Sequence, residues 1–234
     1  GLGRYRANAY RQQRGVALAL RPIPDKVPSL AEIAAPPILQ QLAEIDHGLV
    51  LVVGPTGSGK STTLAAMANH INQTAPKHLL TIEDPVEFVY EARQCLVTQR
   101  EVGRDTPSFA DALKAALRED PDVILLGEMR DLETIRLALT AAETGHLVLA
   151  TLHTATAPQA IERIVDVFPG EERDLARTLL ADVLRAVVAQ QLVARSDGAG
   201  RVAAHEILVG TPAVRSLIRE NKTAQLVSVM QTGQ

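Results

Sequence analysis

The chain has 234 residues, of which 46% are hydrophobic, 22% are charged and 3% are aromatic, and its formal net charge is −3. This composition suits one full α/β domain with a core of Leu, Ile, Val and Ala, and it excludes a broad basic surface for nucleic acid or anionic lipid. All apolar runs are strand-sized and Cys95 is the single cysteine, so we expect a cytosolic chain without a membrane span, a signal peptide, a disulfide or a multi-cysteine zinc site.

The first 23 residues alternate polar and apolar positions over 2–9 and again over 15–20, which predicts two strands joined by residues 11–15. Two strands alone form no stable domain. We therefore expect residues 1–23 to be the end of a smaller α+β N-terminal domain, with its first part missing.

Prolines at positions 22, 24 and 28 predict a linker, and residues 24–48 are interpreted as this linker together with entry helices. Ser29 and Glu32 match a capping box at the start of one short helix. Pro36-Pro37 starts a second helix, in which the apolar positions run on to Ile45. Residues 49–234 are then expected to form the main domain.

Residues 54–62 read GPTGSGKST and fit the phosphate-binding pattern G-x-x-x-x-G-K-[ST]. An apolar run at 49–53 precedes the pattern and a helix-forming run at 62–72 follows it, which is the required order of strand, loop and helix. Glycines let the backbone turn its N–H groups toward a triphosphate, Lys60 reaches the β/γ-phosphates and Ser61 offers its hydroxyl to Mg²⁺. The residues expected to contact ATP are Gly54, Pro55, Thr56, Gly57, Ser58, Gly59, Lys60, Ser61 and Thr62.

Beyond the P-loop, strands and helices alternate, which predicts an α/β fold with a RecA-like doubly wound sheet. The expected strands are 79–82, 96–99, 122–128, 146–151 and 202–209, and the expected helices are 109–117, 132–142, 157–166, 171–193 and two short ones within 212–230.

Glu128 ends an apolar strand that we expect to run beside the P-loop strand, where its carboxylate can direct water at the γ-phosphate. The alternative is that Glu128 only caps the strand or pairs with Arg130. No Asp ends this strand, so Mg²⁺ is expected to depend on Ser61, on waters and on Glu128 itself.

Three carboxylates, Glu83, Asp84 and Glu87, gather beside Pro85 at another strand end. Their mutual repulsion calls for a cation or an arginine nearby. We expect Glu87 to take part in placing metal or water, whereas the alternative is a solvated acidic loop.

His146 and His153 flank one expected strand, and a histidine at a strand end can hydrogen-bond a phosphate or a carboxylate. The alternative is that each is a satisfied polar cap. Arg6 and Arg21 belong to a cluster of N-terminal arginines that could reach the phosphates of a neighbouring subunit, or could be solvated strand charges.

These motifs together resemble the secretion ATPase superfamily, and most closely the twitching-motility or pilus-retraction ATPases of the PilT family. The matching stretches are GRYRANA at 3–9, EDPVEFV at 83–89, QREV at 99–102, ALREDPD at 116–122, GEMRDLET at 127–134, and TGH at 144–146 with TLHT at 151–154. They are similar to the family's PAS-like domain end, its Asp box, its Walker B motif and its His box.

The resemblance implies a hexameric cytosolic motor at the inner face of the bacterial inner membrane, peripheral to that membrane. There, ATP hydrolysis removes pilin from a type IV pilus through an inner-membrane platform protein. It assigns Lys60 and Ser61 to nucleotide and Mg²⁺, Glu128 to catalysis and Glu87 to the Asp box. It assigns His146 and His153 to the His box, and Arg6 and Arg21 to contacts in trans.

Residues 213–220, AVRSLIRE, are similar to the family's AIRNLIRE stretch, which the resemblance ties to retraction; Val214 and Ser216 are the departures. Their helical spacing fits an ordinary packed helix equally well. The family chain is longer at both ends, so the last helices are expected to be missing as well.

Three alternatives remain at this point. Pilus-extension and type II secretion ATPases usually carry a tetracysteine insertion, and one cysteine argues against them. A RecA-like nucleic-acid motor would need a basic stripe with interleaved aromatics, which we do not find. A regulatory subunit that only binds ATP would not need both Lys60 and Glu128.

Overall fold

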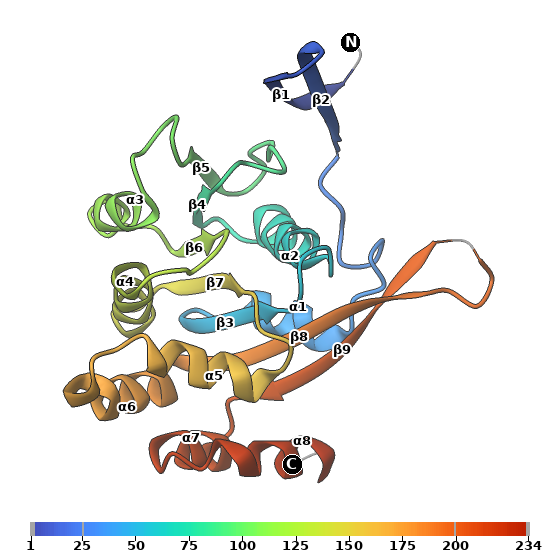
Figure 1. Cartoon of the computed structure of the whole chain (residues 1–234). Coiled ribbons are helices and arrows are strands. Elements are labelled where there is room, and N and C mark those ends of the chain that lie inside the picture. The colour runs from blue at the N-terminus through green and yellow to red at the C-terminus, as the bar shows by residue number, and fades with distance from the viewer. Residues whose placement is uncertain (1–2, 25, 199, 233–234) are drawn as a thin grey trace.

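The structure is a computed structural model that describes residues 3–24, 26–198 and 200–232. A hairpin and a larger α/β body make up the molecule (Figure 1). In chain order the elements are β1 (Arg4–Gln12), β2 (Gly15–Ile23), α1 (Pro37–Ala43), β3 (Gly48–Val53), α2 (Lys60–Thr74), β4 (His78–Glu83), β5 (Leu96–Glu101), α3 (Phe109–Ala116), β6 (Val123–Leu126), α4 (Leu132–Glu143), β7 (Leu147–Leu152), α5 (Ala157–Asp166), α6 (Arg173–Val183), β8 (Leu184–Ala194), β9 (Arg201–Val209), α7 (Pro212–Arg219) and α8 (Leu226–Thr232), with 3-10 turns at Gly170–Glu172 and Thr223–Gln225.

The body is built on a seven-stranded sheet in the order β5-β4-β6-β7-β3-β8-β9, in which the β8–β9 pair alone is antiparallel. The P-loop strand β3 therefore pairs with β7 and β8, and β7 separates it from β6. The expectation that the strand leading to Glu128 runs beside the P-loop strand is wrong. Strand order depends on where each crossover helix returns the chain, and local patterns do not encode this.

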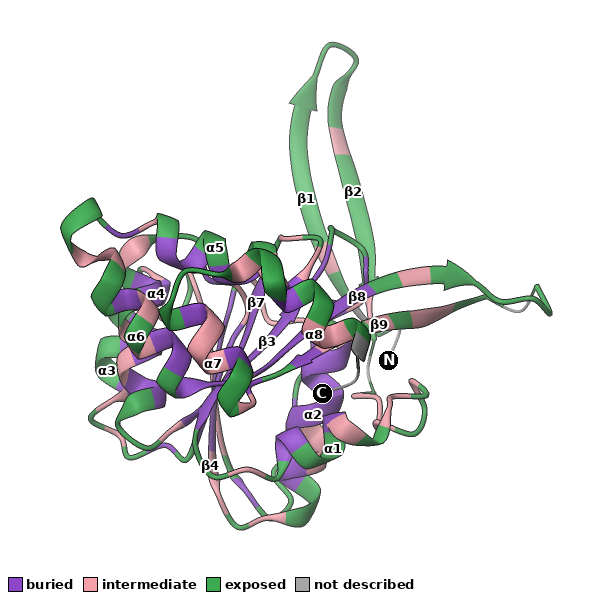
Figure 2. Ribbon diagram, turned by 90° about the horizontal axis from the view of Figure 1, so that it is seen from below, coloured by how far each residue is buried: buried purple, intermediate pink, exposed green. Residues whose placement is uncertain are grey.

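Both faces of the sheet are covered, which explains why the central strands are apolar throughout. On one face, Leu49, Leu51 and Val53 of β3 join a core cluster with residues of α3 to α8. On the other face, Val50 and Val52 pack with α1 and α2. Figure 2 shows this buried layer running through the sheet and its helices.

The sequence predicted one helix over residues 171–193, and this prediction is wrong. Instead α6 ends at Val183 and β8 begins at Leu184 without a Gly or Pro between them. Apart from Arg185, residues 184–189 are apolar, a composition that suits a buried helix or a buried strand, and pairing with β3 decides for the strand.

Ser29 and Glu32 make the reciprocal hydrogen bonds of a capping box: the Ser29 N–H donates to Oε2 of Glu32 at 2.7 Å, and the Glu32 N–H donates to Oγ of Ser29 at 3.2 Å. The helix expected there is only a turn over residues 30–34. The helix expected after Pro36 is confirmed as α1.

Strands β1 and β2 pair antiparallel with Gln12 opposite Gly15, so the predicted pair of strands is confirmed with a tight turn at residues 13–14. This hairpin projects from the body and is mostly exposed (Figure 2). Among the described residues, no helix combines the length and the apolar composition that crossing a membrane requires.

Candidate active site

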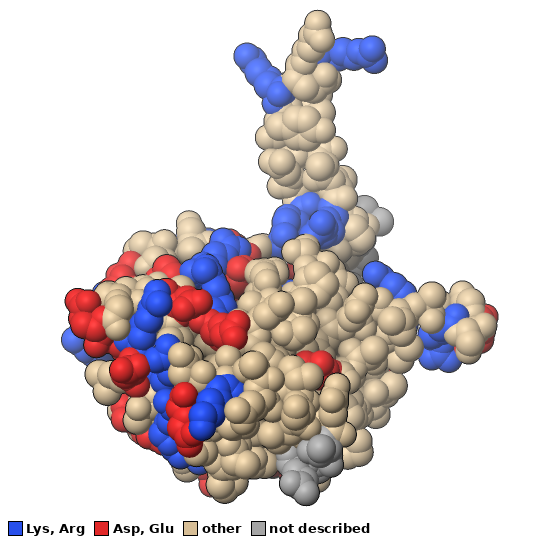
Figure 3. All heavy atoms as spheres, turned by 60° about the horizontal axis from the view of Figure 1, so that its bottom comes forward, with Lys and Arg blue, Asp and Glu red and all other residues tan. Residues whose placement is uncertain are grey.

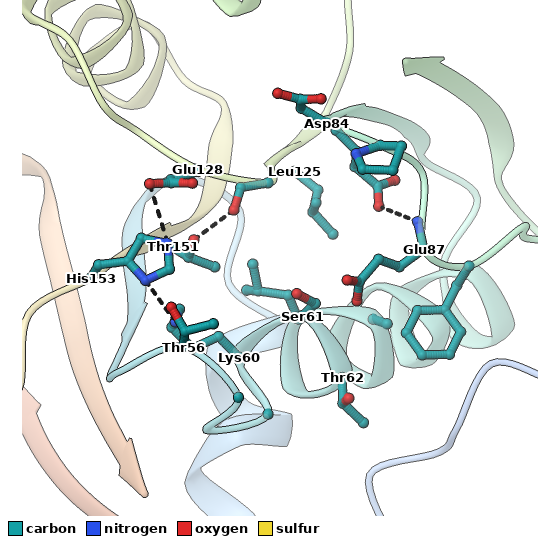
Figure 4. A pocket seen from close by; sticks show the side chains of 18 of the residues that line it. Thr56, Lys60, Ser61, Thr62, Asp84, Glu87, Leu125, Glu128, Thr151 and His153 are labelled. Carbon is teal, nitrogen blue, oxygen red and sulfur yellow. Dashed lines mark hydrogen bonds and ion pairs between the residues drawn. The ribbon is translucent and has the colours of Figure 1, made fainter. Parts of the chain in front are cut away.

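The carboxyl ends of β3, β4, β6 and β7 meet at one edge of the sheet, and each is followed by one of the polar motifs. They surround a cavity of about 510 Å³. The sequence-predicted residues that line it are Arg21, Thr56, Gly57, Gly59, Lys60, Ser61, Thr62, Glu83, Asp84, Glu87, Glu128 and His153. Figure 4 shows Ser61, Glu87, Glu128 and His153 around this space.

The P-loop leaves its backbone N–H groups available to an anion. Gly59 is the N-cap of α2 and has a left-handed conformation, φ 89°. No side chain caps this helix, so the backbone N–H groups of its first turn stay free to donate to an anion. A Cβ at Gly54 would lie 2.6 Å from Oγ of Ser58, too close for any larger residue. The loop thus has the shape of a phosphate cradle.

Lys60 lies folded inside this loop. Its Nζ donates to the carbonyl oxygens of Gly54 at 2.8 Å and Pro55 at 3.1 Å, and lies 3.3 Å from Nδ1 of His153. Burial lowers the pKa of Lys60, and the negative charge of Glu128 opposes that effect. The ammonium is therefore held where a phosphate chain would meet it.

Glu128 is joined to two basic side chains: Oε2 lies 2.7 Å from Nη2 of Arg130, and Oε1 lies 3.2 Å from Nε2 of His153. Partial burial raises the pKa of Glu128, but the hydrogen bond and charge of Arg130 and the hydrogen bond from His153 outweigh it, so the net pKa is lowered. Glu128 lines the cavity, as a residue that directs water would, and it also pairs with Arg130. The pairing and the place in the cavity are therefore not exclusive alternatives.

The neighbouring strands hold the backbone around Glu128 in place. The Gly127 N–H donates to the Ile82 carbonyl at 2.8 Å, the Met129 N–H to the Thr151 carbonyl at 3.1 Å, and the Thr151 hydroxyl to the Gly127 carbonyl at 2.5 Å. Because β6 lies between β4 and β7, both neighbours fix the segment that carries Glu128.

His153 connects the P-loop with Glu128, since one ring nitrogen faces Lys60 and the other faces Glu128 (Figure 4). Because the Lys60 ammonium can only donate, Nδ1 is the acceptor in that contact, and Nε2 is the nitrogen that donates to Glu128; this assignment follows from the partners. His146, the other predicted histidine, lies before the opposite end of β7, where Nδ1 is 2.9 Å from the Ala141 carbonyl. The length of a six-residue strand, about 20 Å, separates it from His153.

On the acidic loop, Glu83 is buried and accepts the Thr81 hydroxyl at 2.8 Å and the Glu87 N–H at 3.3 Å. Asp84 is exposed, and its Oδ2 lies 4.0 Å from Nη1 of Arg130. Glu87 is half-buried and lines the cavity. The three carboxylates thus occupy different environments, which the sequence alone did not separate.

Arg6 and Arg21 are register partners across the hairpin. Arg21 lines the cavity of its own chain, whereas Arg6 is not among the lining residues. Nε of Arg6 is buried and has no hydrogen-bond partner among the described residues.

Sequence reasoning missed two further residues that line the cavity, Leu192 and Arg201. Leu192 lay inside the helix expected over 171–193, and Arg201 lay just before the strand expected over 202–209 and is the first residue of β9. Thr151 was named only as part of the TLHT stretch at 151–154 and was given no role, although it is a polar residue within a buried strand and lines the cavity.

The donors around the cavity fit a nucleotide with Mg²⁺. Ser61 offers an exposed hydroxyl at the first turn of α2, opposite the carboxylates of Glu87 and Glu128 (Figure 4). Oxygen donors of this kind suit a Mg²⁺ ion that keeps several of its waters.

The fold and the site define a RecA-like P-loop nucleoside triphosphatase. A family model described as type II/IV secretion system protein matches residues 32–199, and the chain belongs to this family. It is 58% identical over 233 residues to the type IV pilus retraction ATPase PilT of Pseudomonas aeruginosa, which covers all of this chain and 67% of that protein. It is 60% identical over 233 residues to a twitching motility protein of Neisseria gonorrhoeae, which covers all of this chain and 62% of that protein.

The same likeness holds in three dimensions. A crystal structure of the pilus retraction motor PilT with bound ADP superimposes with a TM-score of 0.95 at 53% identity, covering 99% of this chain and 67% of that one. The chain thus spans about two thirds of the length of the relatives that it matches.

Proposed function

We propose that this chain is the ATP-hydrolysing core of a motor that retracts type IV pili. The observation that carries the proposal is the similarity of the whole of this chain to pilus retraction ATPases, together with the meeting of P-loop, Asp box, Walker B and His box motifs at one cavity. The similarity to pilus retraction ATPases argues against the alternative of a RecA-like motor that moves nucleic acid. In Figure 3, acidic and basic side chains intermingle over the body, and the hairpin carries only scattered basic ones, so the face drawn has no continuous basic stripe.

In the proposed reaction, the N–H groups of the P-loop hold the phosphate chain and Lys60 neutralises the oxygens near the γ-phosphate. Glu128 orients the attacking water and accepts its proton, for which its lowered pKa keeps it ionised at neutral pH. His153 contacts both groups and so links the state of the phosphate to Glu128.

Mg²⁺ would be held by the Ser61 hydroxyl and, through water, by Glu128, with Glu87 on the opposite wall. When bound, the ion supplies positive charge for the β- and γ-phosphate oxygens. The carbonyl oxygens of Gly54 and Pro55 accept from Nζ of Lys60 and so hold the ammonium beside the space that these phosphate oxygens would occupy.

The wider arrangement is proposed by analogy with the relatives. Residues 1–23 end a PAS-like N-terminal domain, residues 24–48 link it, and residues 49–234 form the ATPase domain. Six copies form a ring at the cytoplasmic face of the inner membrane, act on a platform protein there and so reach pilin indirectly. Arg6 and Arg21 then meet the phosphates of a neighbouring copy.

The test is steady-state ATP hydrolysis with Mg²⁺, combined with ADP binding. Glu128→Gln should lower kcat by about 100-fold or more because the base is lost, with ADP affinity within about threefold. Lys60→Ala should reduce both hydrolysis and ADP affinity. Glu143→Gln, on the exposed end of α4, is the matched control and should match wild type.

Normal turnover in both site variants would defeat the proposal. In cells that carry the gene, its loss should give many surface pili and no twitching. Loss of twitching without surface pili would instead indicate an extension motor.

A further inference from the structure

A buried glutamine lies under the P-loop and belongs to none of the motifs described above. Gln190 is 3% exposed near the middle of β8, one residue past Ala189, which is the register partner of Val53. Because side chains alternate along a strand, it faces α2, opposite to Ala189. A buried side-chain amide has to find partners for both of its ends.

Both ends of this amide are bonded to the nucleotide loop and its helix. Nε2 of Gln190 donates to the Ser58 carbonyl at 2.7 Å, and Oε1 accepts from the Thr63 hydroxyl at 2.7 Å. A carbonyl can only accept, so the orientation of the amide follows from its partners.

The loop rests directly on residue 190. A Cβ at Gly54 would lie 2.3 Å from the Gln190 carbonyl oxygen, and one at Gly59 would lie 2.8 Å from Nε2 of Gln190. Both glycines also have positive φ, 150° and 89°. Two glycines of the phosphate-binding pattern are thus required by contact with this residue as well as by backbone conformation.

A trans peptide is planar, so its C=O and N–H groups point in opposite directions. If Gln190 holds the Ser58 carbonyl below the loop, the N–H of Gly59 points away from β8, toward the cavity that Gly59 lines. Among the described residues that N–H has no backbone acceptor. Gly59 directly precedes Lys60, which places its N–H at the β-phosphate end of a bound nucleotide.

We propose that Gln190 is a positioning residue that orients the Ser58–Gly59 peptide so that its N–H donates to the β-phosphate. The inference rests on the proposed nucleotide function and adds to it a residue outside the P-loop. It predicts that Gln190 matters for the diphosphate and not for the remainder of the nucleotide.

The experiment measures the affinity of the chain for ADP and for AMP by calorimetric titration. Gln190→Leu has similar volume but no amide, so the peptide loses its anchor and one charge-assisted hydrogen bond. ADP affinity should fall by about tenfold to 100-fold, and AMP affinity by less than about threefold. Gln191→Leu, its exposed neighbour on the other face of β8, is the matched control and should keep both affinities.

Gln190→Glu gives a second, pH-dependent readout that a structural role would not produce. The ionised carboxylate cannot donate to the Ser58 carbonyl, but the protonated carboxyl can. The ratio of ADP to AMP affinity should therefore approach the wild-type ratio as the pH falls from 8 to 6. Thermal unfolding without nucleotide checks that both variants are folded.

A folded Gln190→Leu variant with the wild-type ratio of ADP to AMP affinity would overturn this inference and leave the proposed function intact. A wild-type chain that binds neither nucleotide would overturn both.

Discussion

Glu83 lies at the end of β4, buried against the floor of the cavity. Burial raises its pKa, and the hydrogen bonds from the Thr81 hydroxyl and the Glu87 N–H only partly oppose this. The folded chain therefore keeps a proton on Glu83 over a pH range in which the unfolded chain, at the ordinary value of 4.5, has released it. Its contribution to stability is present below that range and is lost as the pH rises through it.

The prediction is that Glu83→Gln stabilises the chain at neutral pH, because the amide oxygen still accepts from the Thr81 hydroxyl and the buried charge is removed. This gain outweighs the loss of the long contact at 3.3 Å with the Glu87 N–H, from which the amide NH₂ cannot accept. We expect the melting temperature at pH 7.5 to rise by about 2–4 °C, the change that roughly 1 kcal/mol gives in a chain of this size. Thermal unfolding measured from pH 5 to 8 checks this.

The difference between Glu83→Gln and wild type should shrink toward pH 5. Glu91→Gln, an exposed carboxylate on the same loop, is the control and should show no pH-dependent difference. A Glu83→Gln variant that is less stable than wild type at pH 7.5 would contradict the argument from burial.

At the scale of elements, α7 shows that a helix can resemble a functional motif and also be an ordinary packed helix. Thr211 caps its first turn through the Val214 N–H, and Arg219 pairs with Asp182 of α6 at 2.8 Å. Val214 and Ile218 are buried in the core beneath the sheet, at 1% and 0% exposure. Only the remaining positions of the AVRSLIRE stretch are available to a partner.

We therefore predict that Ile218→Ala destabilises the chain by about 2–4 kcal/mol, because a cavity replaces the buried side chain. The melting temperature should fall by about 5–15 °C. Leu217→Ala, at a half-buried position next to it, is the matched comparison and should lower the melting temperature by less than half as much. Equal losses in the two variants would show that α7 does not pack as described.

Elements with local signals could be predicted from the sequence. The P-loop between β3 and α2 is fixed by its glycines and lysine, and the hairpin by its alternation and turn. Most of the candidate site could also be predicted, because the carboxyl ends of parallel strands lie at one edge of a sheet and the polar motifs follow those ends.

What the sequence could not provide depends on partners far along the chain. β8 is a strand because it pairs with β3, about 135 residues before it, and the position of β7 between β3 and β6 depends on crossovers. Gln190 escaped notice for the same reason, since Ser58 lies 132 residues from it. A polar residue inside a buried strand was its only local signal.

At the scale of the whole molecule, the arginines of the hairpin decide whether an active site is built from one chain or from two. Arg6 and Arg21 face each other across the hairpin, an arrangement of like charges that costs stability unless an anion lies nearby. In the structure, Arg21 lines the cavity of its own chain. In a ring, the projecting hairpin could equally serve the next subunit, and the two cases differ in a mixing experiment.

Lys60→Ala chains keep Arg21 but have no working P-loop, whereas Arg21→Ala chains keep the P-loop but have no arginine. If Arg21 acts in trans, a mixed ring contains intact sites wherever the first kind of chain donates to the second. Random mixing in equal amounts makes about a quarter of the sites intact in a closed ring. ATP hydrolysis should then recover to about a quarter of the wild-type rate after the two inactive proteins are mixed.

The control is a mixture of Lys60→Ala with Glu128→Gln. Both residues lie in one chain, joined through His153, so this mixture contains no intact site and should stay inactive. If the Arg21→Ala mixture stays equally inactive, Arg21 acts within its own chain, as its place in the cavity already allows. If Arg21→Ala alone hydrolyses ATP at the wild-type rate, the arginine is a solvated strand charge.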